Sequence, residues 1–133
     1  MAAQPELKQQ VQDLIRDNKV LLFMKGTPDA PRCGFSMRVV QVLGELNVEY
    51  GAIDVLSDLE PLREATGEIS DWRTFPQLYV NGELVGGADI VEEMLASGEL
   101  AGLLGVEQPA GVEPAPEAAQ SPPGQSPPLQ IEN

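Results

Sequence analysis

The stretch that decides the fold is Lys25-Gly-Thr-Pro-Asp-Ala-Pro-Arg-Cys33-Gly-Phe-Ser36, which carries the only cysteine of the chain. An apolar run, Val20–Met24, precedes it, and a helical pattern of apolar residues follows it. This order predicts a buried strand, a loop rich in Gly and Pro, and a helix whose first turn holds Cys33. A helix N-terminus offers unpaired N–H groups and a positive dipole end, and both stabilise a thiolate.

Cys33 has two interpretations. As a nucleophile or metal ligand, its thiol would have a lowered pKa, with Lys25 and Arg32 as the nearby cations. Alternatively, Cys33 is a small apolar residue of the core, as lone cysteines often are. The polar setting between loop and helix favours the reactive thiol.

The composition limits the class of function. The chain has 133 residues, a formal net charge of −13, no histidine and one cysteine. The acidic charge argues against nucleic-acid binding, which requires a basic surface. The lack of histidine excludes Ser-His-Asp and Cys-His catalysis and zinc sites that contain histidine. One cysteine forms neither an internal disulfide nor a four-cysteine zinc site, so a partner molecule must complete any site built on this thiol.

The sequence also predicts where the protein works. Its apolar runs all fall short of the roughly 20 residues that span a bilayer, so we expect no membrane segment. The segment Met1–Lys8 lacks the features of a secretory signal or a transit peptide. A lone cysteine requires no oxidising compartment. We therefore expect a cytoplasmic protein, or one in an equivalent reducing compartment.

The first half of the chain reads as a helix followed by a β-α-β unit. The periodicity predicts a helix from Pro5 to about Asp17, the strand Val20–Met24, and a loop over Gly26–Arg32. A helix from Gly34 to about Leu46 and a strand over Val48–Asp54 follow. Two strands joined through a helix pair in parallel, with a right-handed crossover.

The second half carries a hairpin between two helices. Asp58 is a candidate N-cap for a helix that reaches about Thr66 and ends at Gly67. Asn81-Gly82 between two short apolar runs predicts a type I′ hairpin. The remaining predicted elements are a helix that opens at Ala88-Asp89 and ends at Ser97-Gly98, and a short helical turn over Glu99–Leu104.

After Gly105 the composition changes. Residues 106–133 hold seven of the twelve prolines and few large apolar side chains, too few to offset the entropy of ordering. We therefore predict one domain over residues 1–105 and a disordered, Pro-rich tail over residues 106–133. The tail either acts as a solubilising appendage or offers its Ser-Pro-Pro segments to a proline-binding module.

Four motifs in this order resemble the monothiol glutaredoxins of the Cys-Gly-Phe-Ser type, within the thioredoxin-fold superfamily. They are Lys25-Gly-Thr, Cys33-Gly-Phe-Ser36, Trp72-Arg-Thr-Phe-Pro-Gln-Leu-Tyr-Val-Asn-Gly82 and Gly86-Gly-Ala-Asp89. The resemblance covers about residues 5–105, and only the tail lies outside it. It implies an α/β fold of the thioredoxin/glutaredoxin type, in which helices flank a four-stranded mixed sheet.

The resemblance also implies two cofactors, glutathione and a [2Fe–2S] cluster that bridges two subunits. Such a cluster needs four ligands, usually thiolates. One Cys33 from each of two chains and the thiols of two glutathione molecules supply them. The family further implies a homodimer when the cluster is bound, with BolA-like proteins and acceptor apoproteins as partners.

The implied glutathione site has two charged ends. Lys25 and Arg63 would pair with the glycyl carboxylate, while Gly87, Ala88 and Asp89 would hold the γ-glutamyl end. A cis Pro76 would present the backbone of the residue before it to the cysteinyl unit. The implied site residues are Lys25, Cys33, Phe35, Arg63, Thr74, Phe75, Pro76, Gly87, Ala88 and Asp89.

Some of these residues have simpler interpretations that stay open. Asp89 alone also fits an ordinary N-cap, Arg63 a solvated helix charge, and Pro76 a proline at a strand edge. We expect Trp72 to pack in the structure rather than to contact the ligand.

The chain departs from the family pattern at two positions. Arg73 stands where proline is common, and it would add a cation beside the site and alter the choice of partner. Ala88 stands where many relatives carry cysteine or serine, so a second thiol is missing. Ser36 occupies the place of the resolving cysteine of dithiol glutaredoxins, and a hydroxyl forms no disulfide.

Three functions remain in competition. The leading hypothesis is a monothiol glutaredoxin that binds glutathione and a subunit-bridging [2Fe–2S] cluster in iron–sulfur cluster assembly and transfer. The alternative is a glutathione-dependent thiol–disulfide oxidoreductase that removes glutathione from proteins through Cys33, with weak activity at most. A third is a redox adaptor in which Cys33 only senses oxidation by becoming glutathionylated.

Overall fold

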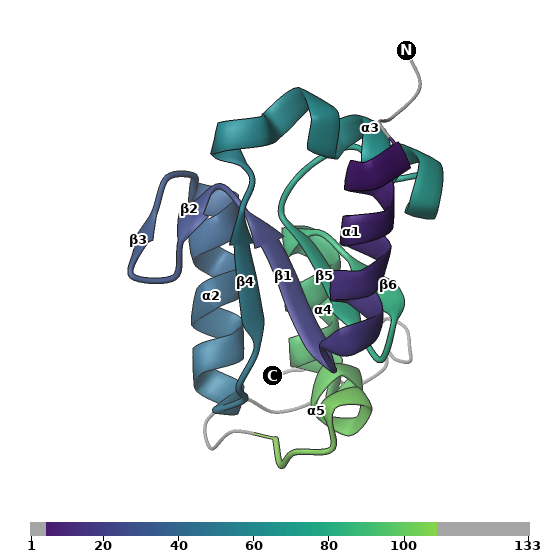
Figure 1. The fold of residues 1–133 in the computed structure, drawn as a ribbon. Helices are drawn as coiled ribbons and strands as arrows, with labels where there is room; N and C mark the ends of the chain where they lie inside the picture. Colours follow the sequence, from purple (N-terminus) through teal and green to yellow (C-terminus); the bar gives the residue numbers. More distant parts are fainter. Residues whose placement is uncertain (1–4, 109–133) are drawn as a thin grey trace, which may run out of the picture.

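A four-stranded sheet with the order β4-β1-β5-β6 forms the centre of the computed structural model, which describes residues 5–108 (Figure 1). The strands are β1 (Val20–Met24), β4 (Gly51–Asp54), β5 (Gln77–Val80) and β6 (Glu83–Gly86). Strand β1 pairs in parallel with β4 and antiparallel with β5, and β5 pairs antiparallel with β6. The predicted mixed sheet, with its parallel β-α-β unit, is confirmed.

Helices cover both faces of the sheet because β1 is apolar on both sides. Leu22 and Met24 point into one core, with α2 (Gly34–Leu46), α4 (Ala88–Ser97) and α5 (Glu99–Leu104). Leu21 and Phe23 point into the other, with α1 (Pro5–Asp17) and α3 (Leu59–Ser70). Successive side chains of a strand face opposite ways, so an unbroken apolar run is what a central strand between two helical layers requires.

The segment between β1 and α2 contains more structure than the expected loop. A small hairpin forms from β2 (Gly26–Thr27) and β3 (Ala30–Pro31). Gly26 has φ +93°, and a Cβ there would lie 2.6 Å from the carbonyl oxygen of Ala30, so only glycine fits this turn. Strands of two residues are too short to leave an alternating pattern in the sequence.

Two predicted boundaries are wrong. The strand expected over Val48–Asp54 begins only at Gly51. Helix α3 continues through Gly67 to Ser70, and a short 3₁₀ turn, η1 (Leu56–Asp58), precedes it. Asp58 occupies the N-cap position of α3, but its side chain makes no capping hydrogen bond.

Gly67 lies inside α3 and not at its end, and its lack of a side chain makes room for Arg73. A Cβ at Gly67 would lie 2.6 Å from Cζ of Arg73, so the Arg73 side chain rests on the helix backbone there. The helix ends at Ser70, and the C-cap residue Asp71 adopts the left-handed conformation at φ +57°.

The hairpin and the last two helices agree with the prediction. Asn81 and Gly82 both have positive φ, +54° and +84°, as a type I′ turn requires. The peptide bond between Phe75 and Pro76 is cis, which confirms that expectation.

The buried side chain of Gln77 holds the segment that leads into β5. Its Nε2 donates to the carbonyl oxygens of Trp72 and Thr74, each at 3.0 Å. Its Oε1 accepts a hydrogen bond from the hydroxyl of Tyr79 at 2.8 Å. One residue of β5 therefore fixes the backbone on both sides of Arg73.

The described chain continues past residue 105. The N–H of Val106 donates to the carbonyl of Ala101 at 3.0 Å, and Nε2 of Gln108 donates to the carbonyl of Leu95 at 2.9 Å.

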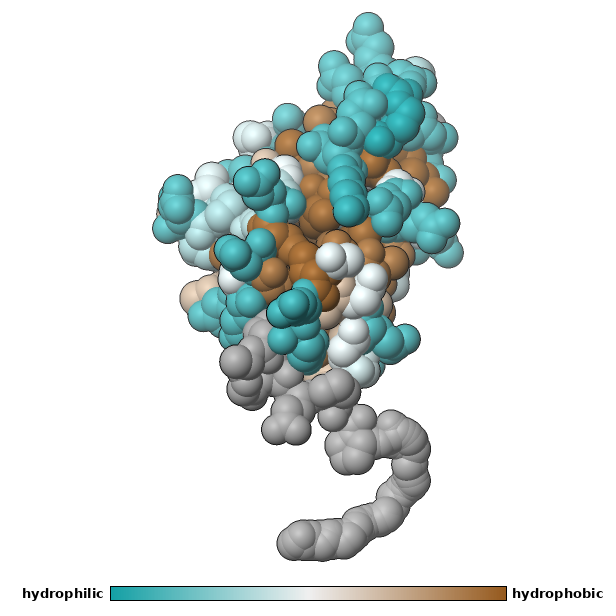
Figure 2. Space-filling model, turned by 90° about the horizontal axis from the view of Figure 1, so that it is seen from below, coloured by the Kyte–Doolittle hydropathy of each residue, from teal (hydrophilic) through white to brown (hydrophobic). Residues whose placement is uncertain are grey.

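Seen from below the view of Figure 1, hydrophobic residues gather in the middle of the surface with hydrophilic ones around them (Figure 2). Residues 109–133, most of the predicted tail, lie outside the described residues, as do residues 1–4. Within residues 5–108, every helix is too short or too polar to cross a bilayer.

We predict that Gln77→Leu lowers the free energy of unfolding by about 2–4 kcal/mol, since two partly buried carbonyl groups lose their donor and the Tyr79 hydroxyl loses an acceptor. Tyr79→Phe, which removes one hydroxyl of the same network, is the control and should cost about 1 kcal/mol. Urea denaturation measures both losses. Equal losses would show that Gln77 does not anchor the segment.

We also predict that a chain ending at Gly105 melts about 4–8 °C below one ending at Gln108. The reason is the loss of the partly buried Val106 and of two hydrogen bonds, together worth about 1 kcal/mol. Calorimetry of the two truncated chains measures the difference. Identical melting temperatures would show that residues 106–108 add nothing to the domain.

Candidate functional site

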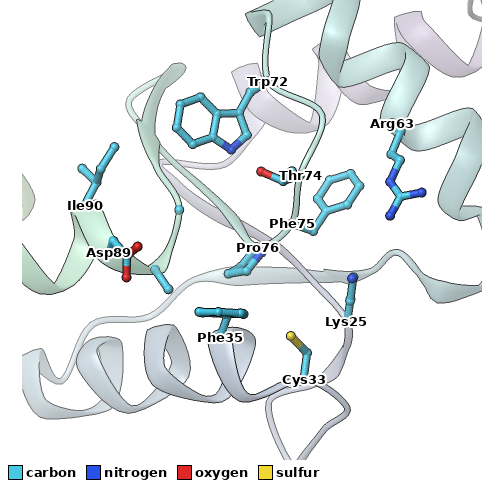
Figure 3. Close-up of a pocket in the computed structure, with 12 residues that line it drawn as sticks. Lys25, Cys33, Phe35, Arg63, Trp72, Thr74, Phe75, Pro76, Asp89 and Ile90 are labelled. Atoms are coloured by element: carbon cyan, nitrogen blue, oxygen red, sulfur yellow. The ribbon is translucent and has the colours of Figure 1, made fainter.

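A cavity of about 460 Å³ opens where the end of β1, the start of α2, the segment before β5 and the start of α4 meet (Figure 3). This volume suits a small ligand. The cavity brings together all ten residues that the sequence singled out, together with Trp72 and Ile90. The lining residues are Lys25, Cys33, Phe35, Arg63, Trp72, Thr74, Phe75, Pro76, Gly87, Ala88, Asp89 and Ile90.

Cys33 lies on the wall of this cavity and not in the apolar core. It is the N-cap residue of α2, with extended backbone and a half-buried side chain. Figure 3 shows its sulfur pointing into the space between Lys25 and Phe35. Burial raises the pKa of the thiol, but the N–H groups of Ser36 and Phe35, the Lys25 ammonium and the Ser36 hydroxyl together lower that pKa below its ordinary value.

The backbone of Lys25 is held on both sides. Its N–H donates to Oγ of the fully buried Ser36 at 3.0 Å, and its carbonyl accepts from the N–H of Arg32 at 2.9 Å. The next N–H, of Gly26, donates to Oδ1 of Asp54 at 3.0 Å. These bonds fix the starting point of the Lys25 side chain at the cavity.

Arg32 acts elsewhere than expected. The N–H groups of Leu56 and Gly26 lower the pKa of the Asp54 carboxyl, and Arg32 adds to this effect. Of the two cations expected at the thiol, Lys25 contributes to the lowered pKa of Cys33, whereas within residues 5–108 Arg32 acts on Asp54.

The segment before β5 forms the opposite wall. Phe75 is buried and packs against Phe23, with the ring centroids 6.4 Å apart. The cis bond then turns the chain so that Pro76 leads directly into β5. Pro76 therefore both precedes a strand and lines the cavity, so its two interpretations describe one position.

Gly87, Ala88 and Asp89 form the start of α4 at one end of the cavity. Gly87 is the N-cap, so the interpretation of Asp89 as an ordinary N-cap is wrong. The Asp89 side chain is 82% exposed, and its Oδ1 lies 2.9 Å from Nη2 of Arg38. The start of a helix favours an anionic group, and the Asp89 carboxylate favours a cationic one.

Arg63 has features of both interpretations, a charge on an exposed helix face and a residue of the cavity. Its guanidinium forms an ion pair with Glu60 on the same helix, as an exposed helix charge does. It also lines the cavity, on the same side as Lys25 (Figure 3).

Three further residues belong to the site or support it. Trp72, expected to pack, lines the cavity, and its Nε1 is buried without a hydrogen-bond partner among the described residues. Ile90 lines the cavity as an apolar residue in the first turn of α4, and no motif marked it. Arg38 was missed because its contacts to α4 arise only from the tertiary structure.

The two departures have different outcomes. Ala88 lines the cavity without a polar group. Arg73 lies against Gly67 of α3 and is absent from the cavity lining, so the expected extra cation does not line the site.

The described residues hold no cluster of three or more His, Cys, Asp or Glu side chains that could bind a metal ion. The site therefore offers one thiol of lowered pKa on a cavity wall, with Lys25 and Arg63 toward one end and Asp89 with the start of α4 toward the other. In its thiolate form, such a group can attack a disulfide, or it can ligate a metal that other molecules also ligate.

Comparisons with known proteins identify relatives in sequence and in fold. The Glutaredoxin family matches residues 20–85. A probable monothiol glutaredoxin 2 from Rickettsia typhi is 56% identical over 94 residues, which cover 71% of this chain and 84% of that relative. Some relatives are much longer: this chain spans 19% of the length of monothiol glutaredoxin-S17 from Arabidopsis thaliana.

Solved structures share the fold. The solution structure of reduced poplar apo GrxS14 is 47% identical with a TM-score of 0.68, over 79% of this chain and 95% of that one. The crystal structure of a buckwheat glutaredoxin–glutathione complex is 27% identical with a TM-score of 0.68, over 75% of this chain and 88% of that one. With its lone thiol and these relatives, the chain belongs to the monothiol glutaredoxin family.

Proposed function

We propose that this protein binds glutathione in the cavity and, as a pair of chains, carries a [2Fe–2S] cluster that it transfers to acceptor proteins. The observation that carries the proposal is a single thiol of lowered pKa on a cavity wall, in a chain that has no second cysteine. Such a thiol is an incomplete site, and glutathione and a second chain complete it.

The charges along the cavity support glutathione as the ligand. Lys25 and Arg63 suit the glycyl carboxylate. Asp89 and the start of α4 suit the ammonium and the carboxylate of the γ-glutamyl end. The cysteinyl unit would then lie between these ends, beside Cys33. The buckwheat relative supports this ligand, since its structure is a glutathione complex.

The ligand count supports a cluster shared between two chains. A [2Fe–2S] cluster takes about four protein or thiol ligands, and each chain with one bound glutathione supplies two sulfurs. Phe35, which lines the cavity with Cys33, and Met37, one turn of α2 after Cys33, are 53% and 45% exposed and offer apolar surface to a second chain. The cluster is then cargo held at the surface, within reach of an acceptor.

The partners and the compartment remain predictions that rest on the family. They comprise BolA-like proteins, acceptor apoproteins and a cytoplasmic or equivalent reducing setting. Two glutathione thiols serve as ligands only where glutathione is abundant and reduced, which is consistent with such a compartment.

The second candidate is a glutathione-dependent oxidoreductase, which the lowered pKa of Cys33 favours. The Cys33 thiolate would attack the glutathione sulfur of a protein–glutathione disulfide and release the protein thiolate. A second glutathione thiolate would then attack that same sulfur, regenerate Cys33 and leave as glutathione disulfide. Ser36 forms no disulfide, so external glutathione must complete the cycle.

Anaerobic reconstitution with iron, sulfide and glutathione tests the leading proposal. We predict a brown dimer with about two iron atoms per pair of chains, and no iron in Cys33→Ser because that variant lacks the protein ligand. Absorbance and native mass measure the result. Omitting glutathione from the wild type is the control and should also prevent loading.

Iron retention by Cys33→Ser, or loading without glutathione, would contradict the proposed ligand set. Fast reduction of a glutathione mixed disulfide by a protein that never takes up iron would favour the oxidoreductase. A protein that neither turns brown nor reduces mixed disulfides would support the third hypothesis, a redox adaptor.

We also predict that Lys25→Met raises the pKa of Cys33, because the thiolate loses a stabilising ammonium. The rate of alkylation by iodoacetamide against pH reports this pKa, and its midpoint should move to higher pH. Lys19→Met removes the same charge just before β1, at the other end of the strand, and should leave the midpoint in place. The same midpoint in both variants would exclude Lys25 as the cause.

A further inference from the structure

Arg38, one turn into α2, connects the two sides of the cavity near Asp89. Its Nη2 lies 2.9 Å from Oδ1 of Asp89 and 2.8 Å from Oε1 of Glu92, both on α4. Its guanidinium also lies over the ring of Phe35, with Cζ 5.1 Å from the ring centroid. One side chain of α2 thus contacts two carboxylates of α4 and an aromatic ring of the cavity wall.

Arg38 does not itself line the cavity, whereas Phe35 and Asp89 do. The Arg38 side chain is 35% exposed, compared with 82% for Asp89. An exposed carboxylate of this kind turns freely unless something holds it. Within residues 5–108, Arg38 is the one cation that pairs with Asp89, through Oδ1, and Oδ2 accepts no hydrogen bond.

We propose that Arg38 is a positioning residue that fixes the Asp89 carboxylate and the Phe35 ring, so that this end of the cavity selects ligands with an α-ammonium group. The inference rests on the proposed binding of glutathione. Oδ1 of Asp89 stays with Arg38, and Oδ2 accepts the ammonium of the γ-glutamyl unit. The ligand therefore joins the ion pair and does not break it.

The position of the Asp89 carboxylate gives the direction of the effect. Without Arg38, the Asp89 side chain rotates freely, and it loses rotamer entropy when it binds the ammonium of the ligand. A ligand without the ammonium does not bear this cost. The loss of Arg38 therefore weakens glutathione more than an analogue that lacks the α-ammonium group.

An isolated surface ion pair contributes little, so the network matters here. The Arg38 guanidinium is planar and serves two carboxylates and one ring at once, which a lysine ammonium does less well. Arg38→Lys should therefore keep part of the effect.

The experiment compares two ligands on the reduced full-length protein by calorimetric titration. They are glutathione and its analogue without the α-ammonium group, glutaryl-cysteinyl-glycine. We expect Arg38→Met to lower the affinity for glutathione about three- to tenfold and the affinity for the analogue less than about twofold. The affinity of Arg38→Lys for glutathione should lie between those of Arg38→Met and the wild type. Methionine keeps an apolar chain against Phe35, and thermal melts check that the variants fold.

Arg16→Met is the matched control. Arg16 also lies 3.0 Å from each of two carboxylates, Asp13 and Asp17, but on α1, away from the cavity lining. Its removal changes the net charge equally and should leave both affinities unchanged.

Three outcomes would overturn the inference. Equal weakening of both ligands in Arg38→Met would indicate a general structural role. Unchanged or tighter glutathione binding would show that Arg38 is idle or competes with the ammonium. If Arg38→Met fails to fold, Arg38→Lys takes its place. The inference is then overturned if Arg38→Lys prefers glutathione over the analogue by the same factor as the wild type. Failure of the wild type to bind glutathione would instead overturn the proposed function, and the inference with it.

Discussion

The burial of β1 on both faces is the constraint on which the site depends. Each of its five residues is buried, so the strand has no freedom to slide or rotate between the two cores. The chain leaves the strand at Lys25, turns through the hairpin β2–β3 and returns to start α2 at Cys33. A rigid strand thus sets where both the cation and the thiol of the cavity begin.

Ser36 and Gln77 transmit this rigidity to the two walls. Buried Ser36 accepts a hydrogen bond from the backbone N–H of Lys25 and helps to lower the pKa of Cys33, so one hydroxyl serves both the backbone of Lys25 and the thiol. Buried Gln77 holds the carbonyls of Trp72 and Thr74 on the opposite wall. Both residues are polar and fully buried, and each is satisfied by groups that define the site.

The sequence predicts what local rules and family motifs govern, and it fails where distant segments decide. The strand β1 and the Asn81-Gly82 turn follow from apolar runs and turn chemistry, and the motifs brought ten residues to one cavity. Gly67 reads as a helix stop, but it permits close packing of Arg73, which lies just beyond the end of α3 and outside the helical pattern. Arg38 is missed because its partners lie 51 and 54 positions further along the chain.

The lowered pKa of a lone thiol links the two candidate functions. The groups that stabilise the thiolate are the N–H groups of Ser36 and Phe35, the Lys25 ammonium and the Ser36 hydroxyl. A thiolate stabilised this way stays available both to attack sulfur and to ligate iron. Which reaction prevails then depends on what the cavity holds, because a bound glutathione thiol beside Cys33 adds a second metal ligand, whereas a bound glutathione disulfide offers a sulfur to attack.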